Sequence, residues 1–285
     1  MALPNHTPLN YRIWHYTYLT FCFLVFFFLI APLFVILPLS FNAEQYIHFS
    51  AKMLALDPEG FSLRWYEDMI FGTKNPWGLA TKNSLIIAFF ATIGSTILGT
   101  VAALGLSSRH MPYKAAFMAL LISPMIVPLI ISGTAIFFFM AKVGLAATHT
   151  GIVLSHIILG TPFVVITVTA TLVGFDMNMV KASQSLGARP VRTFFKIIMP
   201  LILPGVISGA LFAFITSFDE VVIVMFMASL DQLTIPKQMW AGIRQEISPV
   251  ILCMATCLVV LSILLLTTVE LLRRRSEKLR GITSR

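Results

Sequence analysis

The sequence predicts an all-α membrane protein with about six transmembrane helices. Of its 285 residues, 58% are hydrophobic and only 11% are charged, whereas a typical soluble domain is about half apolar and about a quarter charged. The apolar residues fall in runs of about twenty, the length that a helix needs to cross ~30 Å of hydrocarbon. The runs are apolar on every side, unlike the alternating strands of a membrane barrel. Because lipid cannot satisfy free backbone groups, we expect each run to be a helix.

We expect six spans in one transmembrane domain that covers residues 1–285. The first apolar run is longer than the core of a signal peptide, and no small-residue cleavage pattern follows it, so we expect it to be retained as a helix. Prolines in the third and fourth spans, at Pro124, Pro128 and Pro162, are expected to bend those helices. The spans are predicted at 19–39, 84–106, 115–140, 152–175, 201–224 and 250–272.

Small residues recur four positions apart in two spans, as Ser95 with Gly99 and Gly205 with Gly209. Such patterns let two helices approach closely. They serve either packing within the chain or a seam between subunits, and we favour the first.

The distribution of Lys and Arg predicts the orientation of these spans. Of the 20 Lys and Arg residues, 13 lie at the two ends of the chain and in the connections on the same side. The 7 on the opposite side are Lys52, Arg64, Lys74, Lys82, Lys142, Lys237 and Arg244. The positive-inside rule therefore places both termini in the cytoplasm. The net charge of +8 is then a topology signal that also suits contact with lipid headgroups, and we expect no nucleic-acid partner.

The chain shows no pattern for catalysis. It has no G-x-x-x-x-G-K-[ST] phosphate loop, no G-x-S-x-G elbow and no H-E-x-x-H pair. Cys253 and Cys257 lie four residues apart, but no His or third Cys accompanies them, so we interpret them as small apolar residues rather than a metal pair. His156, in a span, is expected to hydrogen-bond between helices. We expect no enzyme activity, no catalytic residue, no metal and no cofactor in this chain.

Two adjacent acids, Asp219 and Glu220, follow Ser217 inside the fifth predicted span. An acid at the centre of a membrane helix costs roughly 2.5 kcal/mol or more. Adjacent residues on a helix differ by about 100° in direction, so the two cannot face the same way. Either the pair is solvated near the outer interface, or one acid lines a translocation path and the other faces a neighbouring helix. We favour the second and take Ser217, Asp219 and Glu220 as candidate substrate-path residues.

The connection at 176–199 is long for a cytoplasmic loop and has a helical pattern on each side of a break. Asp176 can cap the first short helix, Gly187 suits the left-handed residue that ends it, and Pro190 can open the second. The residues predict a short helix–turn–helix beneath the membrane. It is either a docking surface for a cytoplasmic partner or an amphipathic pair that packs on the bilayer, and physical pattern alone leaves both open.

The loop resembles the EAA loop of ABC-importer permeases, in which Glu-Ala-Ala is followed by three residues, a glycine and later an apolar-Leu-Pro. Lys181, Ala182 and Ser183 stand at the Glu-Ala-Ala positions, so two of the three depart from the pattern. Gly187 stands at the glycine. The closing stretch is 197–200, and the segments 83–85, 161–163 and 174–176 are also similar to the family.

The acidic pair, with the stretches 233–240 and 246–249, resembles the polyamine (spermidine/putrescine) branch of these permeases. The resemblance implies a type I ABC-importer permease fold in a bacterial plasma (inner) membrane. It also implies import of a small cationic or amine-bearing solute such as a polyamine, with ATP hydrolysis on a separate subunit. The implied partners are a second permease subunit, two ATP-binding cassette subunits and a periplasmic solute-binding protein, besides the lipid bilayer.

In the resembled family this loop docks on the ATPase. The coupling residues so implied are Lys181, Ala182, Ser183, Leu186, Gly187, Ala188 and Arg189. The alternative is a self-sufficient secondary transporter that uses the intramembrane acids for proton coupling. Such a transporter has no need of a docking helix.

Overall fold

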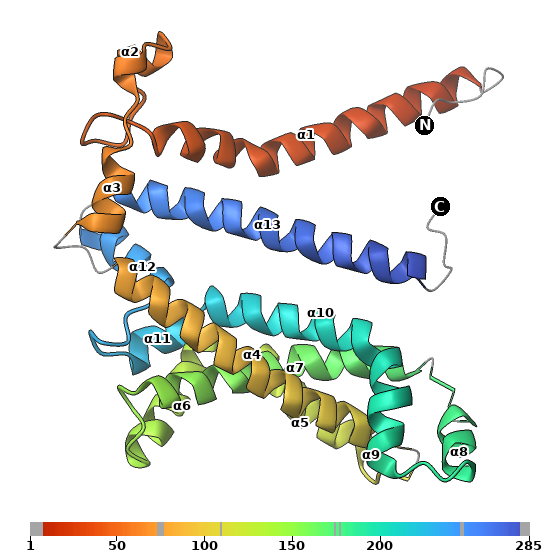
Figure 1. Ribbon diagram of the computed structural model, residues 1–285. Helices are drawn as coiled ribbons and strands as arrows, with labels where there is room; N and C mark the ends of the chain where they lie inside the picture. Colours follow the sequence, from red (N-terminus) through yellow and green to blue (C-terminus); the bar gives the residue numbers. More distant parts are fainter. Residues whose placement is uncertain are drawn as a thin grey trace. The chain divides into compact units, whose positions relative to one another are not determined.

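The computed structural model describes residues 8–72, 77–108, 110–173, 175–176, 178–245 and 248–279, with side chains as far as 267. The described residues form helices and their connections, with one isolated bridge between Asn42 and Phe61 (Figure 1). The predicted all-α fold class is thereby confirmed. The chain divides into two compact units, Lys74–Ala241 and the combination of Met1–Thr73 with Gly242–Arg285. We call them the central unit and the terminal unit.

The terminal unit is built on two long apolar helices, α1 (Leu9–Leu39) and α13 (Pro249–Leu279), which contact each other. Almost all of α1 is exposed in the chain by itself, as expected of a helix that faces lipid. Three short helices follow α1: α2 (Ala51–Leu54), η1 (Pro58–Gly60) and α3 (Arg64–Phe71).

Side-chain hydrogen bonds tie α3 to the end of α1 and α1 to α13. The indole of Trp65 donates to the carbonyl of Asn42 at 2.9 Å, and the hydroxyls of Tyr66 and Ser40 lie 2.8 Å apart. The thiol of Cys253 donates to the carbonyl of Ser40 at 3.2 Å, so this cysteine is a buried packing residue.

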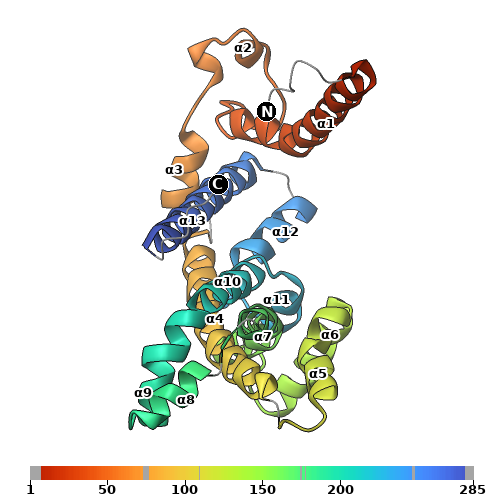
Figure 2. The same cartoon turned by 90° about the vertical axis from the view of Figure 1, so that its right-hand side faces the viewer.

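Three helices form the core of the central unit: α4 (Trp77–Ser107), α7 (His149–Val173) and α10 (Met199–Phe218). Figure 2 looks along α7, with α4, α10 and α11 (Val222–Met227) around it. The remaining helices of this unit are α5 (Lys114–Ile126), α6 (Leu129–Lys142), α8 (Asn178–Ser185), α9 (Pro190–Thr193), η2 (Phe194–Ile198) and most of α12 (Ile235–Gln245).

Both small-residue stripes face α7 within the chain. A Cβ added at Gly209 would lie 2.7 Å from the Cα of Val164, and one added at Gly99 would lie 2.5 Å from the Cβ of the same valine. No side chain fits at these distances unless the helices move apart. The patterns therefore serve packing within the chain, as favoured above.

The structure divides two of the predicted spans. Five helices among the described residues are long and apolar enough to cross a membrane, or six if a bent pair is counted as one span. That pair is α5 and α6, which meet at 102°, so the span predicted at 115–140 is bent at Pro128, where a bend was expected. Pro128 has no N–H to donate and forces the preceding Val127 into the extended conformation found there (ψ 133°).

The fifth predicted span, 201–224, is also interrupted. The helical segment begins at Pro190, earlier than predicted, and α10 ends at Phe218 before the separate helix α11. The acids Asp219 and Glu220 lie in this interruption, between α10 and α11.

Replacing Gly209 with alanine should separate α10 from α7 and destabilise the chain by about 1–3 kcal/mol, the usual cost of overpacking. Gly105→Ala is the matched control, because a Cβ at Gly105 meets nothing within 4 Å and alanine favours a helix. Thermal unfolding of the purified chain in detergent measures both. A Gly209→Ala variant as stable as Gly105→Ala would contradict the close approach.

Candidate functional site

The acidic pair lies at the break between α10 and α11. Asp219 is the residue that ends α10, and its side chain is exposed. Glu220 is 6% exposed. The expectation that both acids lie within one continuous helix is therefore wrong.

The carboxylate of Glu220 caps the N-terminus of α11. It accepts hydrogen bonds from the backbone N–H groups of Val222 at 2.8 Å, Ile223 at 2.9 Å and Val224 at 3.2 Å. These are the amides that the first turn of a helix leaves without a partner. A carboxylate at this position also lies at the positive end of the helix dipole. Local capping thus competes successfully with continuation of α10.

Lys237, from α12, lies at the opposite end of α11. Its ammonium donates to the carbonyl of Ala228 at 2.7 Å and to that of Val224 at 3.5 Å. Burial lowers the pKa of Lys237, because desolvation disfavours the charged form. The six-residue helix α11 therefore has an acid at its positive end and a base at its negative end. Sequence reasoning missed Lys237, since no spacing rule joins it to Glu220.

Ser217 and His156 complete a buried cluster with Glu220. The Nδ1 of His156 lies 2.8 Å from the hydroxyl of Ser217, and its Nε2 lies 3.6 Å from the nearer carboxylate oxygen of Glu220. The predicted hydrogen bond of His156 between helices is confirmed, since it joins α7 to α10. The structure thus brings two of the three substrate-path candidates together inside the protein and leaves Asp219 alone at the surface.

The connection after α11 is fastened to the start of α4. The amide nitrogen of Asn83 donates to the carbonyls of Asp231 at 2.8 Å and Leu233 at 2.9 Å, and its oxygen lies 3.1 Å from Nε2 of His149. The hydroxyl of Ser84 accepts from the N–H of Ile235 at 2.9 Å. The polar pair at 83–84 therefore fixes the position of α11 from its far side.

The loop at 176–199 forms the predicted helix–turn–helix. Asp176 accepts from the N–H of Asn178 at 2.9 Å, which caps α8. Gly187 has φ +78°, and the N–H groups of Gly187 and Ala188 donate back to the carbonyls of Gln184 and Ser183. This pair of bonds is the Schellman motif that ends many helices. Pro190 then opens α9, as predicted.

The candidate coupling residues divide between the inside and the surface of this loop. Ser183 is buried, and its hydroxyl lies 2.9 Å from that of Thr193, which joins α8 to α9. The side chain of Leu186 is 88% exposed at the tip. Lys181, Ala182, Gly187 and Arg189 are also exposed, and Ala188 is partly so. The tip is therefore an apolar projection beside a glycine turn with positive charge around it.

The loop is joined to α10 by the π-helix η2, which continues directly into α10 at Met199. π-Helical turns are rare, and they occur frequently at functional sites. Helical backbone therefore runs without a break from the loop into α10.

Comparisons with known proteins agree on one family. Residues 95–278 match the family described as "Binding-protein-dependent transport system inner membrane component". The chain is 30% identical over 257 residues to the spermidine/putrescine transport system permease protein PotC of Haemophilus influenzae, covering 90% of this chain and 96% of that protein. It is 29% identical over 239 residues to the putrescine transport system permease protein PotI of Escherichia coli (strain K12), covering 81% of each.

A solved structure shares the fold. A chain in the crystal structure of a bacterial ABC transporter involved in the import of the acidic polysaccharide alginate matches with a TM-score of 0.70 and 15% identity. The match covers 95% of this chain and 99% of that one. The predicted permease fold is confirmed, and the alternative of a self-sufficient secondary transporter finds no support. The chain belongs to the family of inner-membrane components of binding-protein-dependent transport systems.

Proposed function

We propose that this chain is the permease subunit of an ATP-driven importer for a small cationic solute of the polyamine class. The observation that carries the solute class is the similarity to polyamine permeases over about nine-tenths of the chain. The exposed carboxylate of Asp219, at the end of a core helix, supports it, because a cationic solute needs an anionic group along its path.

The proposed assembly has two permease subunits, two ATP-binding cassette subunits and a periplasmic solute-binding protein. ATP hydrolysis occurs on the cassette subunits, and this chain needs no cofactor. Both termini and the loop at 176–199 lie in the cytoplasm, because the basic residues concentrate there. The exposed Leu186 and the turn at Gly187 dock on a cassette subunit, while Arg189 meets acidic groups at the rim.

Within the acidic cluster the proposed roles differ. Asp219 lines the solute path. The other two candidates have structural roles: Glu220 holds the start of α11 from inside the protein, and Ser217 joins α10 to α7 through His156. The solute therefore meets the carboxylate of Asp219, and the position of Asp219 depends on the buried carboxylate of Glu220.

Uptake by reconstituted vesicles tests the proposal as a whole. The chain is purified with its associated subunits from native membranes and reconstituted, and uptake of radiolabelled putrescine is measured with and without internal ATP and the binding protein. We expect uptake only when both are present. Uptake driven by an ion gradient with this chain alone would overturn the proposal.

Gly187→Glu should reduce ATP-driven uptake at least about tenfold, because the new side chain keeps the loop tip away from the ATPase. The substitution also strains the backbone, since φ +78° costs a residue with a Cβ ~1–2 kcal/mol. Gly144→Glu is a matched control, because Gly144 has φ +75° and, like Gly187, open space around its Cα. Gly144 follows α6 and lies outside the loop. Equal losses in the two variants would assign the effect to backbone strain rather than docking.

Asp219→Asn should raise the KM for putrescine about five- to tenfold. This factor corresponds to the loss of one solvent-accessible hydrogen bond to a charged group, which contributes about 1–1.5 kcal/mol to binding. The effect on mono-N-acetylputrescine, which carries one charge fewer, should be smaller. Glu220→Gln should instead lower thermal stability and reduce uptake of both solutes alike. A uniform effect of Asp219→Asn on the two solutes would place that acid outside the path.

A further inference from the structure

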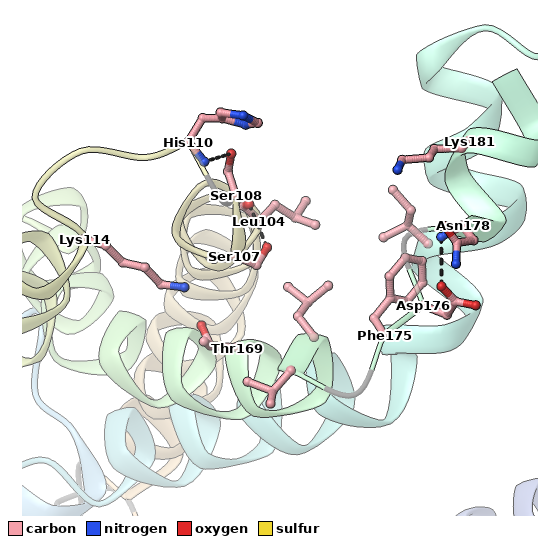
Figure 3. Close-up of a pocket in the computed structure, with 13 residues that line it drawn as sticks. Leu104, Ser107, Ser108, His110, Lys114, Thr169, Phe175, Asp176, Asn178 and Lys181 are labelled. Carbon is pink, nitrogen blue, oxygen red and sulfur yellow. Dashed lines mark hydrogen bonds between the residues drawn. The ribbon is translucent and has the colours of Figure 1, made fainter.

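A cavity of about 780 Å³ lies in the central unit beside the helix–turn–helix (Figure 3). It is bordered by the end of α4, the start of α5, the end of α7 and the start of α8. It is distinct from the acidic cluster and from the exposed loop tip, and nothing in the proposed transport cycle uses it.

The cavity has an excess of positive charge. Lys114 from α5 and Lys181 from α8 extend into it from opposite sides in Figure 3. The ion pairs found among the described residues join other groups: His48 with Glu44, Lys52 with Glu59, and His156 with Glu220. Lys114 is also the first residue of α5, where the helix dipole adds positive potential.

One carboxylate, that of Asp176, lines the cavity, and one of its oxygens accepts the capping bond from Asn178. The hydroxyl-bearing residues Ser107, Ser108 and Thr169 also line the cavity.

Part of the lining is apolar. Leu104, Leu172, Val173, Phe175 and Ile198 form this wall, and the remaining polar side chains are those of His110 and Asn178. The cavity also lies where three helices end or begin, at Ser107 of α4, Lys114 of α5 and Val173 of α7. In the proposed orientation these helix ends lie at the cytoplasmic side of the bilayer. An apolar wall with cations at its edge matches an amphiphile with an anionic head.

We propose that this cavity binds the phosphate headgroup of an anionic phospholipid from the cytoplasmic leaflet. Lys114 and Lys181 hold the phosphate, and the apolar wall receives the upper part of the acyl chains. Basic pockets between transmembrane helices on the cytoplasmic side bind such headgroups in other proteins. The inference rests on the proposed cytoplasmic position of the loop.

The site gives a physical reason for the departure at position 181. A glutamate there, as in the resembled EAA pattern, would repel a phosphate, whereas Lys181 attracts it. A bound headgroup links α8 to α5 and so fastens the proposed ATPase-docking loop to the membrane. The lipid would then set how far the loop moves with the ATPase.

The test is a titration of the full-length chain, purified in neutral detergent, with fluorescent phosphatidylglycerol. Phosphatidylcholine, whose phosphate is neutralised by its own choline group, is the reference without net charge. Each basic residue near a membrane surface contributes about fivefold in affinity for an anionic lipid, so Lys114→Gln with Lys181→Gln should weaken binding about 25-fold. Lys196→Gln is the matched control, since Lys196 lies in the same region but outside this cavity.

A second variant predicts a change of the opposite sign. Asp176→Asn removes the one carboxylate of the lining, and asparagine caps helices as well as aspartate does. Phosphatidylglycerol should therefore bind about fivefold more tightly. A gain of affinity is not produced by misfolding, so this variant separates a lost site from a lost fold.

Four results would overturn the inference. The first is an equal affinity of the wild type and the double lysine variant for phosphatidylglycerol, and the second is an equal loss of this affinity in Lys196→Gln. The third is displacement of the lipid by millimolar inorganic phosphate, and the fourth is displacement of the lipid by the ATPase subunit. The third would assign the cavity to a soluble anion, and the fourth would assign the lysines to acidic groups of the partner. The titration uses neither solute nor ATP, so it is independent of the outcome of the uptake experiments.

Discussion

The carboxylate of Glu220 at the start of α11 is the interaction on which this end of the central unit depends. It accepts three backbone N–H groups in a buried position, and bonds to a charged group are each worth about 1.5–3 kcal/mol. Lys237 at the far end and Asn83 behind the next connection complete the attachment. Without Glu220, the first-turn amides of α11 would be buried and unpaired, and a helix of six residues has little stability of its own.

That anchoring explains how the neighbouring acid remains exposed, as its proposed role in the solute path requires. Glu220 takes the buried, satisfied position, so the chain must turn at Asp219 and leave its side chain exposed. The hydrophobic cluster beneath, which includes Ile87, Ile152 and Ile223, fixes α11 against α6 and α7. An acid on a rigid and fully paired element is preorganised, which limits the entropy lost when a cation binds.

The opposite end of α10 leads to the loop that is proposed to dock on the ATPase. The Ser183–Thr193 hydroxyl pair and the Schellman turn at Gly187 make the loop a unit with a defined tip, and η2 joins it to α10 without a flexible linker. In the proposed cycle one helix thus carries the ATPase contact at one end and the solute carboxylate at the other. The proposed lipid site at Lys181 would add the bilayer to this linkage.

The sequence by itself determined the helical membrane class, the helix–turn–helix at 176–199 and the family, because hydrophobic length, Asp, Gly and Pro capping and motif spacing are local properties. The bend at Pro128 also followed from the local effect of proline, whereas tertiary structure decided the break at Asp219 and which acid is buried. Those outcomes depend on partners far along the chain, such as Lys237 and His156, and no local pattern names them. A span long enough to cross a membrane predicts a helix, but whether that helix continues past an acid depends on what the acid's carboxylate can bind.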